Sequence, residues 1–452
     1  MSCSVKKVFF FFFLLHPFIF QEIQIGTTAS LKQPSSFIIF CRPTNSSMVK
    51  HGVTGNLLPT GQPPMKAAKY PKLELVRGSL KIRWYRCPMR KGSLKLLMER
   101  SDKKGFIQAL GHLGLWAMTG LMVHSSWQRS NVACCVIAMW FHGIVGSTFV
   151  YGCHELGHGT VFATKWLNTL FLWIFSVLFW WNPYDYAASH TYHHRYSQFQ
   201  EGDRENLPPL VPALGKFTVL QLATCNVFST PGNVFGKGGM ISTILLTIKS
   251  ALGGVASFPS AAQHEWLKAV HADQPEEFAK SMHASQLIVL FHTSIFGYAF
   301  MTNQWIVFLI VSLHQFFSNW LSYLVGSCQH MGLKSNVPDF RLNSRTILLP
   351  RGLEFLFWNM NFHIEHHMFA NVPFYNLQAL HNEVRLYMPK PRTLFEAWRE
   401  MRETYRRQLI DCRYEYETPL PNIEPKIAGG GLEIDELAYG LGDLAPAGLR
   451  KR

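Results

Sequence analysis

Three short histidine clusters hold the residue types in this chain that are best suited to chemistry. They are His154-Glu155-Leu156-Gly157-His158, His190-Thr191-Tyr192-His193-His194 and His363-Ile364-Glu365-His366-His367. These fifteen positions contain eight of the twenty histidines in the 452 residues. Imidazole is a ligand for iron, copper, nickel and zinc. Because eight imidazoles are more than one such ion can hold, the sequence predicts a site for two metal ions.

The spacing within the clusters supports two ions. In each cluster two histidines lie four residues apart, so on a helix they would share one face. In the two HxxHH clusters the middle histidine is offset by about 100°, which would let it reach a neighbouring ion. The first cluster alone also fits HExxH, in which Glu155 would be the general base of a zinc protease. A protease needs only one further ligand, however, so the two HxxHH clusters favour the dinuclear interpretation.

The remaining histidines carry weaker signals. His330 directly follows an apolar stretch, at the depth expected of the three clusters, and we predict that it is a ninth ligand. Single histidines within apolar stretches are expected to be satisfied polar groups: His112, His124, His142, His292 and His314. Four others are expected at the surface: His264, His271, His283 and His381.

Long apolar stretches must position these clusters, and a bilayer crossing needs about 20 apolar residues. Residues 106–127 and 130–154 are uncharged, and so is the run 281–333, which suits two helices with a turn near residues 302–304. Residues 166–181 are shorter and are expected to be interfacial or re-entrant, and the interrupted stretch 239–259 is expected to lie at the membrane surface. The predicted fold is an all-α integral membrane protein: four transmembrane helices, interfacial helices and a cytosolic helical cap that holds the dinuclear site.

Charge indicates the orientation. The net charge is +15, and basic residues are dense at 66–104, 341–351 and 385–407, whereas the turns on the other side have little beyond Arg129. By the positive-inside rule both ends are cytosolic, so all three clusters face the cytosol. Basic residues in such positions meet anionic headgroups or an acidic redox partner. The charge therefore does not indicate nucleic-acid binding.

The expected organisation has three parts. Residues 1–104 form a basic N-terminal tail, 105–395 the membrane domain and 396–452 a flexible C-terminal tail. An apolar leader at 8–20 resembles a signal peptide but lacks a clear cleavage site, and Met48 or Met65 are alternative starts. The nine cysteines include no CxxC pair and are expected to be free thiols in a reducing compartment.

The series HxxxH, HxxHH, HxxHH resembles the membrane fatty acid desaturase and hydroxylase superfamily. The resemblance covers roughly residues 105–395 and includes these further segments: Gln329-His330, Asn361-Phe362-His363 and Val372-Pro373-Phe374-Tyr375-Asn376. Two departures are clear. The third cluster opens with His363, unlike the QxxHH form of the cytochrome-fused front-end desaturases. Gly326 stands where the acyl-CoA desaturase branch carries a metal-site Asn.

This resemblance implies a non-haem centre of two irons. The implied ligands are His154, His158, His190, His193, His194, His363, His366 and His367, with His330 added. Such a centre uses O2 to remove hydrogen from an unactivated C–H bond. Desaturation of a fatty acid or acyl lipid is expected, and lipid hydroxylation is the alternative. Glu155 and Glu365 would accept hydrogen bonds from ring N–H groups, as would Asp203 and Glu205; solvated charges are the alternative.

The sequence also bears on the electron donor and on the substrate. It has no HPGG haem motif, no flavin or nicotinamide fingerprint and no ferredoxin cysteine set, so electrons are expected from a separate protein such as cytochrome b5 or ferredoxin. The substrate should be a membrane-resident lipid. Aromatic residues between the first two clusters would form an interfacial belt or line an acyl channel: Trp173, Trp180, Trp181, Tyr184 and Tyr186.

The expected location is a multi-pass position in a membrane, that of the endoplasmic reticulum in a eukaryote, with the active site facing the cytosol. Two functions of other classes stay open, a zinc-dependent membrane hydrolase and a non-catalytic lipid receptor. Metal analysis separates the three, because two irons, one zinc and no metal are their respective expectations.

Overall fold

A computed structural model describes residues 73–206, 215–228, 238–255 and 268–422. The apolar leader at 8–20, the alternative starts Met48 and Met65, His264 and the end of the C-terminal tail lie outside these residues.

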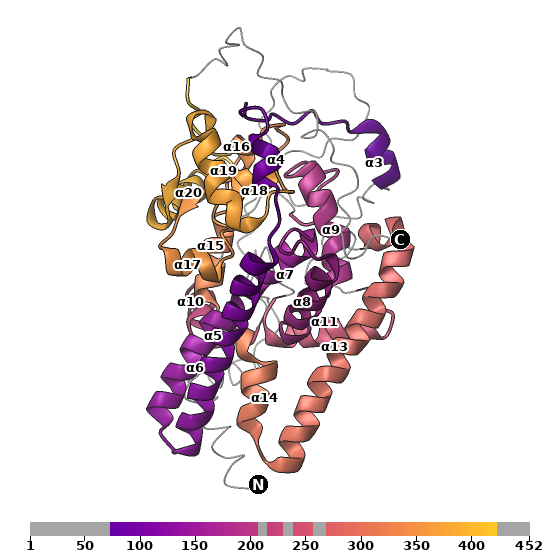
Figure 1. Cartoon of the computed structure of the whole chain (residues 1–452), viewed down its shortest axis with the longest axis vertical. Helices are drawn as coiled ribbons and strands as arrows, with labels where there is room; N and C mark the ends of the chain where they lie inside the picture. The colour runs from indigo at the N-terminus through magenta and orange to yellow at the C-terminus, as the bar shows by residue number, and fades with distance from the viewer. Residues whose placement is uncertain (1–72, 207–214, 229–237, 256–267, 423–452) are drawn as a thin grey trace.

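Three helical stretches in the described chain are long and apolar enough to cross a membrane. The first is α5 (Asp102–Gln128). The second consists of α6 (Val132–Ser147) and α7 (Phe149–His158), which are joined through Thr148. The third is α13 (Pro275–Thr302). At about 1.5 Å per residue, each exceeds the roughly 30 Å of a hydrocarbon core. They coincide with the first three predicted spans, and Figure 1 shows α5, α6 and α13 as the long lower part of the molecule.

Polar side chains set the ends of these helices. The side chain of Ser101 accepts a hydrogen bond from the Lys104 amide at the start of α5, and that of Asn131 accepts one from the Cys134 amide at the start of α6. Such caps satisfy amide groups that have no partner within the helix. Asn303 ends α13 in a left-handed conformation with φ 56°, and this confirms the turn predicted near residues 302–304.

The fourth predicted span is not one continuous helix. It consists of α14 (Trp305–Ser312), the 3-10 turn η1 (His314–Phe316) and α15 (Trp320–Ser327). Each of the two α-helices has eight residues, about 12 Å. Main-chain groups at the break bind the segment after α10 (Lys216–Ala223): the Asn226 amide donates to the Phe316 carbonyl at 2.7 Å, and the Ser318 amide to the Thr224 carbonyl at 2.8 Å. The number of four crossings therefore stays a prediction.

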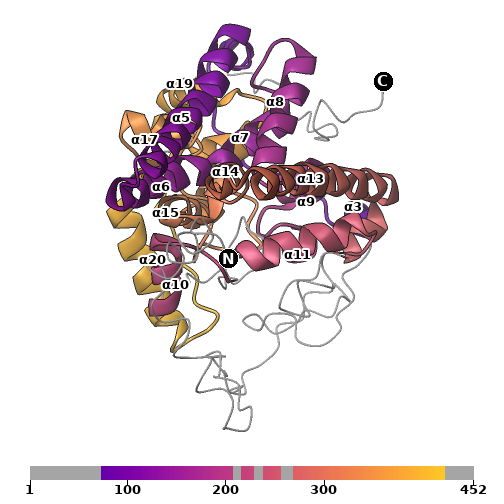
Figure 2. The same ribbon diagram turned by 90° about the horizontal axis from the view of Figure 1, so that it is seen from below.

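Shorter helices pack beside the long ones. Helix α8 (Lys165–Leu178) and helix α11 (Met240–Ala251) have 14 and 12 residues, too few to span a bilayer. Helix α11 runs along α13, as Figure 2 shows. Helix α9 (Pro183–Tyr196) is fixed to α13 by Asn182, whose amide donates to the Ser281 carbonyl at 2.7 Å and to Ser285 Oγ at 2.8 Å.

Most of the remaining elements lie in the upper part of the molecule, away from the α5–α6 and α13–α14 turns, and the helix at residues 351–356 lies near mid-height (Figure 1). They are α3 (Leu73–Ser79), α4 (Ser93–Leu97), α16 (Phe340–Asn343), β1 (Ile347–Leu348), α17 (Arg351–Leu356), α18 (His363–Met368), η2 (Phe374–Asn376), α19 (Leu377–Val384), η3 (Arg385–Tyr387), β2 (Arg392–Thr393) and α20 (Leu394–Gln408). Strands β1 and β2 pair in parallel over two residues. The predicted domain boundary at residues 395 and 396 falls inside α20, which begins with a capping box of Thr393 and Glu396.

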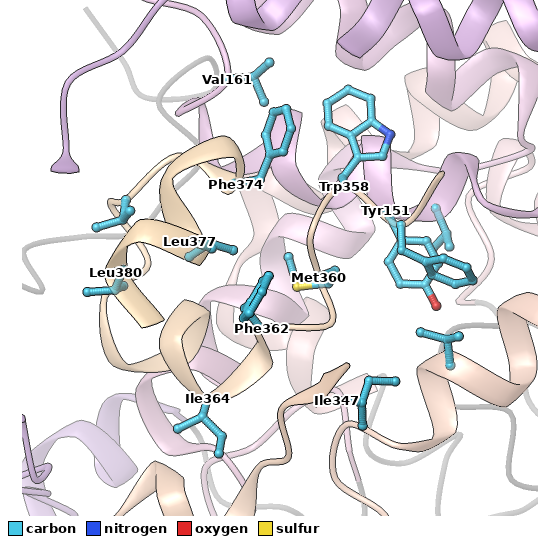
Figure 3. Packing of buried hydrophobic residues seen from close by; sticks show 14 of the residues in the cluster. Tyr151, Val161, Ile347, Trp358, Met360, Phe362, Ile364, Phe374, Leu377 and Leu380 are labelled. Atoms are coloured by element: carbon cyan, nitrogen blue, oxygen red, sulfur yellow. The ribbon is translucent and has the colours of Figure 1, made fainter. Parts of the chain in front are cut away.

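Apolar packing holds the segment around the third histidine cluster. Trp358, Met360 and Phe362 precede α18 and pack with residues of the following elements, including Phe374 and Leu377 (Figure 3). All five are at most 2% exposed. The backbone that carries the third cluster is therefore part of the largest apolar core in the described chain.

The described cysteines only partly fit the free-thiol expectation. Six are free thiols: Cys87, Cys134, Cys135, Cys153, Cys225 and Cys328. Cys412 is disulfide-bonded, so the expectation is wrong for this residue.

Candidate metal centre

The structure brings all nine predicted histidine ligands together in two groups. The five-histidine group consists of His154, His158, His190, His194 and His366. The four-histidine group consists of His193, His330, His363 and His367. Within each group, one nitrogen from every ring lies within 4.8 Å of the others. All of the rings are buried except that of His158, which is intermediate.

The helical spacing of the histidines within a cluster determines which of the two groups each histidine joins. On α9, His190 and His194 share one face and join the five-histidine group, whereas His193 joins the four-histidine group. On α18 the division is reversed, because His363 and His367 belong to the four-histidine group and the middle residue His366 to the other. This confirms that the middle histidine of each HxxHH cluster turns toward a neighbouring group.

The Nε2 atoms converge within each group. In the five-histidine group, His190 Nε2 lies 2.9 Å from His194 Nε2 and 3.2 Å from His158 Nε2. In the four-histidine group, His363 Nε2 lies 2.8 Å from His330 Nε2 and 3.0 Å from His367 Nε2. Lone pairs that face each other at these distances repel unless a cation or a shared proton lies between them. The arrangement therefore fits a bound metal ion.

Oxygen atoms hold the opposite ring nitrogens. Asp203 lies 2.9 Å from His193 Nδ1, and Glu205 contacts His190 Nδ1. Glu155 lies 2.9 Å from His154 Nδ1 and 3.5 Å from His366 Nδ1. An Nδ1–H bound to a carboxylate leaves Nε2 deprotonated and able to bind a metal. These contacts agree with the roles expected of Glu155, Asp203 and Glu205.

Glu365 differs from its expected role. Its carboxylate contacts Nδ1 of His381 on α19 and accepts a hydrogen bond from Thr346 Oγ1 at 2.6 Å. His381 belongs to neither histidine group. Although Glu365 is flanked by candidate ligands in the sequence, its side chain leaves a different face of α18 and joins this helix to α19 and to the segment before β1.

Burial determines the charge of the rings on α9 and α18. It lowers the pKa of His190, His194, His363, His366 and His367 well below the usual value, with further lowering by neighbouring histidines. Burial also opposes the charge of His193, but Asp203 and Glu205 raise its pKa overall. Burial raises the pKa of Glu205 to about 7. Neutral imidazole is the form that binds metals, so most of these rings are prepared for ligation.

Most of the single histidines in the apolar stretches form hydrogen bonds with main-chain carbonyl groups instead of joining the two groups. Ring nitrogens donate to main-chain carbonyls as follows: His112 to Val145 at 3.2 Å, His142 to Ile310 at 3.0 Å, His292 to Val177 at 2.9 Å and His314 to Leu178 at 3.0 Å. These carbonyls lie in the last turns of α6, α14 and α8, where carbonyl groups lack the regular helical partner; the Val145 carbonyl also accepts from the Thr148 amide at 3.3 Å. His124 contacts Gln128 at 3.3 Å. The prediction of satisfied polar groups is confirmed for His112, His142 and His292, whereas Nδ1 of His314 is buried without a hydrogen-bond partner among the described residues.

Two histidines that we expected at the surface are not exposed. His271 is 8% exposed and lies 3.2 Å from Asp185. His381 is partly buried against Glu365. His283 is exposed, as predicted.

Two small cavities adjoin the histidine groups. One, of about 20 Å³, is lined by His154, His158, His190 and His194 together with Tyr186. The other, of about 10 Å³, lies against the four-histidine group and is lined by Glu205, Asn206 and Gln329. Among the five aromatic residues considered for an acyl channel, Tyr186 borders the first cavity. Trp180 instead stacks on His292 and donates to the Ser312 carbonyl at 2.7 Å.

Several contacts of the site have no signal in the sequence. His330 Nδ1 lies 2.9 Å from the Asn343 carbonyl, and His367 Nδ1 lies 3.1 Å from Ser197 Oγ. Neither partner belongs to a motif. Gly326, at the position of the metal-site Asn of the acyl-CoA desaturase branch, lies in α15 and has no side chain to offer.

Long apolar helices and a buried double group of histidines define a membrane protein with a candidate dinuclear metal centre. A family model described as fatty acid desaturase matches residues 125–398, well over half of the chain. The chain therefore belongs to the fatty acid desaturase family, and it is an oxidoreductase of that family. No curated protein is similar enough in sequence to be matched to this chain.

Proposed function

We propose that this protein uses dioxygen to oxidise an unactivated C–H bond in a lipid acyl chain, forming a double bond. The reaction would take place at two iron ions, one held by the five-histidine group and one by the four-histidine group. Iron in such a site supplies the oxygen activation that no side chain can provide.

One observation carries this proposal. All nine candidate ligands are nitrogen donors in two groups, and each of the two HxxHH clusters contributes to both groups. The shared clusters keep the two groups adjacent. A zinc protease of the HExxH type requires one ion with a free position for water, and a receptor requires no such arrangement. The geometry thus favours the oxidase over both other classes.

The protein's own residues would orient and shield the ions. Asp203, Glu205 and Glu155 fix the rings of His193, His190 and His154 through Nδ1. The buried aromatic residues around α18, including Trp358 and Phe362, exclude water from the same region. Hydroxylation would use the same ligands, so the product must distinguish it from desaturation.

The proposal also includes the side of the membrane on which the active site lies and the source of the electrons. The basic flanks of the apolar helices favour an active site on the cytosolic side of the endoplasmic reticulum membrane. The chain has no haem, flavin or ferredoxin motif, so electrons would come from a separate protein such as cytochrome b5 or ferredoxin.

The experiment is metal analysis and lipid profiling of the chain expressed in yeast. We expect two irons per chain and a new unsaturated acyl product. Replacing His193 or His366 by Ala should abolish the product while the chain stays in the membrane, because each change removes one ligand and leaves the apolar helices intact. One zinc per chain would indicate the hydrolase, and no metal would indicate the receptor. Full activity of either variant would contradict the di-iron site, and a hydroxylated product would indicate hydroxylation.

A further inference from the structure

The larger cavity at the site borders one histidine group in particular. Its volume is about 20 Å³, which exceeds the minimum of roughly 10–15 Å³ that a single water needs. Four of the five rings of the five-histidine group line it. Besides Tyr186, the wall is completed by Cys153, Gly157, Leu172, Pro183, Ala187 and Thr191, and the Thr191 hydroxyl donates to the Ala187 carbonyl at 2.8 Å. The cavity thus has room for about one molecule of the size of water next to the rings that would hold the ion.

Tyr186 supplies a phenol group at this cavity. Its ring stacks on that of His190, with the centroids 4.5 Å apart and an interplanar angle of 19°. Tyr186, His190 and His194 follow each other at intervals of four residues on α9, so they share one face of the helix. The helix that positions two candidate ligands therefore also positions this side chain.

The hydroxyl of Tyr186 is buried and has no hydrogen-bond partner among the described residues. A buried hydroxyl without a partner is unfavourable, and structures rarely keep one without a reason. Tyr151, another buried tyrosine near the site, shows the ordinary situation, since its hydroxyl donates to the Ser322 carbonyl at 3.2 Å. The indole nitrogen of Trp181 is also unpartnered, but Trp181 does not line the cavity.

We propose that this cavity is the binding pocket for a small ligand of the five-histidine ion, and that Tyr186 donates a hydrogen bond to that ligand. The ligand class is a diatomic molecule of the size of dioxygen or nitric oxide. This inference rests on the proposed metal site. It assigns Tyr186 a role that neither its position between the clusters nor the family implies.

Nitric oxide is a suitable probe, because it binds ferrous iron and its N–O stretching frequency responds to a hydrogen bond. The variants are Tyr186→Phe, which removes one oxygen and keeps the stacked ring, and the control Tyr192→Phe. Tyr192 is on the same helix but packs against Tyr196 and Val76, away from both cavities. Iron content, the N–O stretch in H2O and in D2O, and nitric oxide affinity would be measured on the purified full-length proteins.

We expect two irons in all three proteins. The N–O band should shift on deuteration in the parent and in Tyr192→Phe but not in Tyr186→Phe, whose dissociation constant for nitric oxide should rise about fivefold, as loss of one hydrogen bond implies. An unchanged band shift and affinity in iron-loaded Tyr186→Phe would overturn the role of Tyr186 and leave the metal site standing. Absence of iron from the parent would overturn the proposed function itself, and this inference with it.

Discussion

Oxygen atoms hold one nitrogen of several candidate ligands and so determine which nitrogen of these rings faces the site. Glu155, Asp203 and Glu205 each hold an Nδ1 atom, and the Asn343 carbonyl does the same for His330. The ring orientation is thereby fixed before any metal binds. The opposite nitrogens are left to converge, and such preorganisation increases metal affinity.

Glu205→Gln tests this orientation at one ring. The amide keeps the size of the side chain but removes the charge that holds His190 Nδ1. We expect metal affinity or turnover to fall by about 10–100-fold, the usual effect of losing such a partner. Iron titration of the purified protein measures the affinity. The exposed Glu201→Gln is the control and should change neither quantity; equal behaviour of both variants would argue against the role of Glu205.

His330→Ala tests the ninth ligand. The change removes one of only four rings of its group. Iron content should fall from two toward one per chain, and turnover should fall by more than about 100-fold, beyond the loss of an outer partner. His124→Ala, in a partly exposed position on α5, should keep both. If His330→Ala retained two irons and full turnover, the second group would have three ligands.

The nine histidines singled out in the sequence all lie in the two groups. Eight of them are recognisable by their helical spacing, and His330 by its place after an apolar stretch. Asp203 and Glu205 were also found, since they closely follow the second cluster. Glu365 was assigned wrongly because sequence neighbours on a helix point in directions about 100° apart. Its true partner, His381, lies on another helix and has no signal of its own. Contacts that tertiary packing creates, such as that of Ser197 with His367, cannot be read from local spacing.

At the level of helices, hydropathy identified three long spans but missed the break in the fourth. Residues 313–319 contain no charge, so an average over a long window does not separate them from a helix. The break depends on distant partners, because the Asn226 amide and the His142 ring satisfy carbonyls at residues 316 and 310. Irregular backbone at membrane depth is tolerated where the protein supplies such partners.

Gly143→Ala tests the packing at this break. A Cβ atom at Gly143 would lie 2.1 Å from the Phe317 carbonyl oxygen, so α6 and the break must separate. We expect a loss of about 1–3 kcal/mol in the free energy of unfolding, seen as a lower thermal midpoint in detergent. A Cβ atom at Gly297 would meet nothing within 4 Å, so Gly297→Ala should be neutral or stabilising by about 0.5–1 kcal/mol. A midpoint of Gly143→Ala at or above that of the parent would refute this account.

The contact between His381 and Glu365 joins α19 to α18 and should depend on pH. Burial opposes the charge on His381, but Glu365 raises its pKa above the ordinary 6.5. A raised pKa in the folded state stabilises the protein fully below 6.5, and this stabilisation is lost as pH rises through the folded value. His381→Gln should therefore lower the thermal midpoint more at pH 6 than at pH 9. The same decrease at both pH values would show that the charge of His381 does not contribute.

For the whole molecule, the orientation in the membrane is the property to test. Tags at residue 90, within residues 200–235 and at residue 420 should all be cytosolic, whereas a glycosylation acceptor near Arg129 should be modified in the endoplasmic reticulum. The reason is that basic residues flank one set of helix ends and that α8, with 14 residues, is too short to cross. Glycosylation of an acceptor within residues 200–235 would mean that the chain crosses the membrane between the first two clusters.

The division of the third cluster between both groups has a consequence for biosynthesis. His366 completes one group, and His363 and His367 supply half of the other. A nascent chain that has not yet reached residue 363 can assemble four of the five rings in one group but only two of the four in the other. If the two groups bind ions as proposed, stable loading of both would therefore wait until translation has passed the last membrane segment. The order of synthesis would then keep the emerging chain from holding both sites in complete form too early.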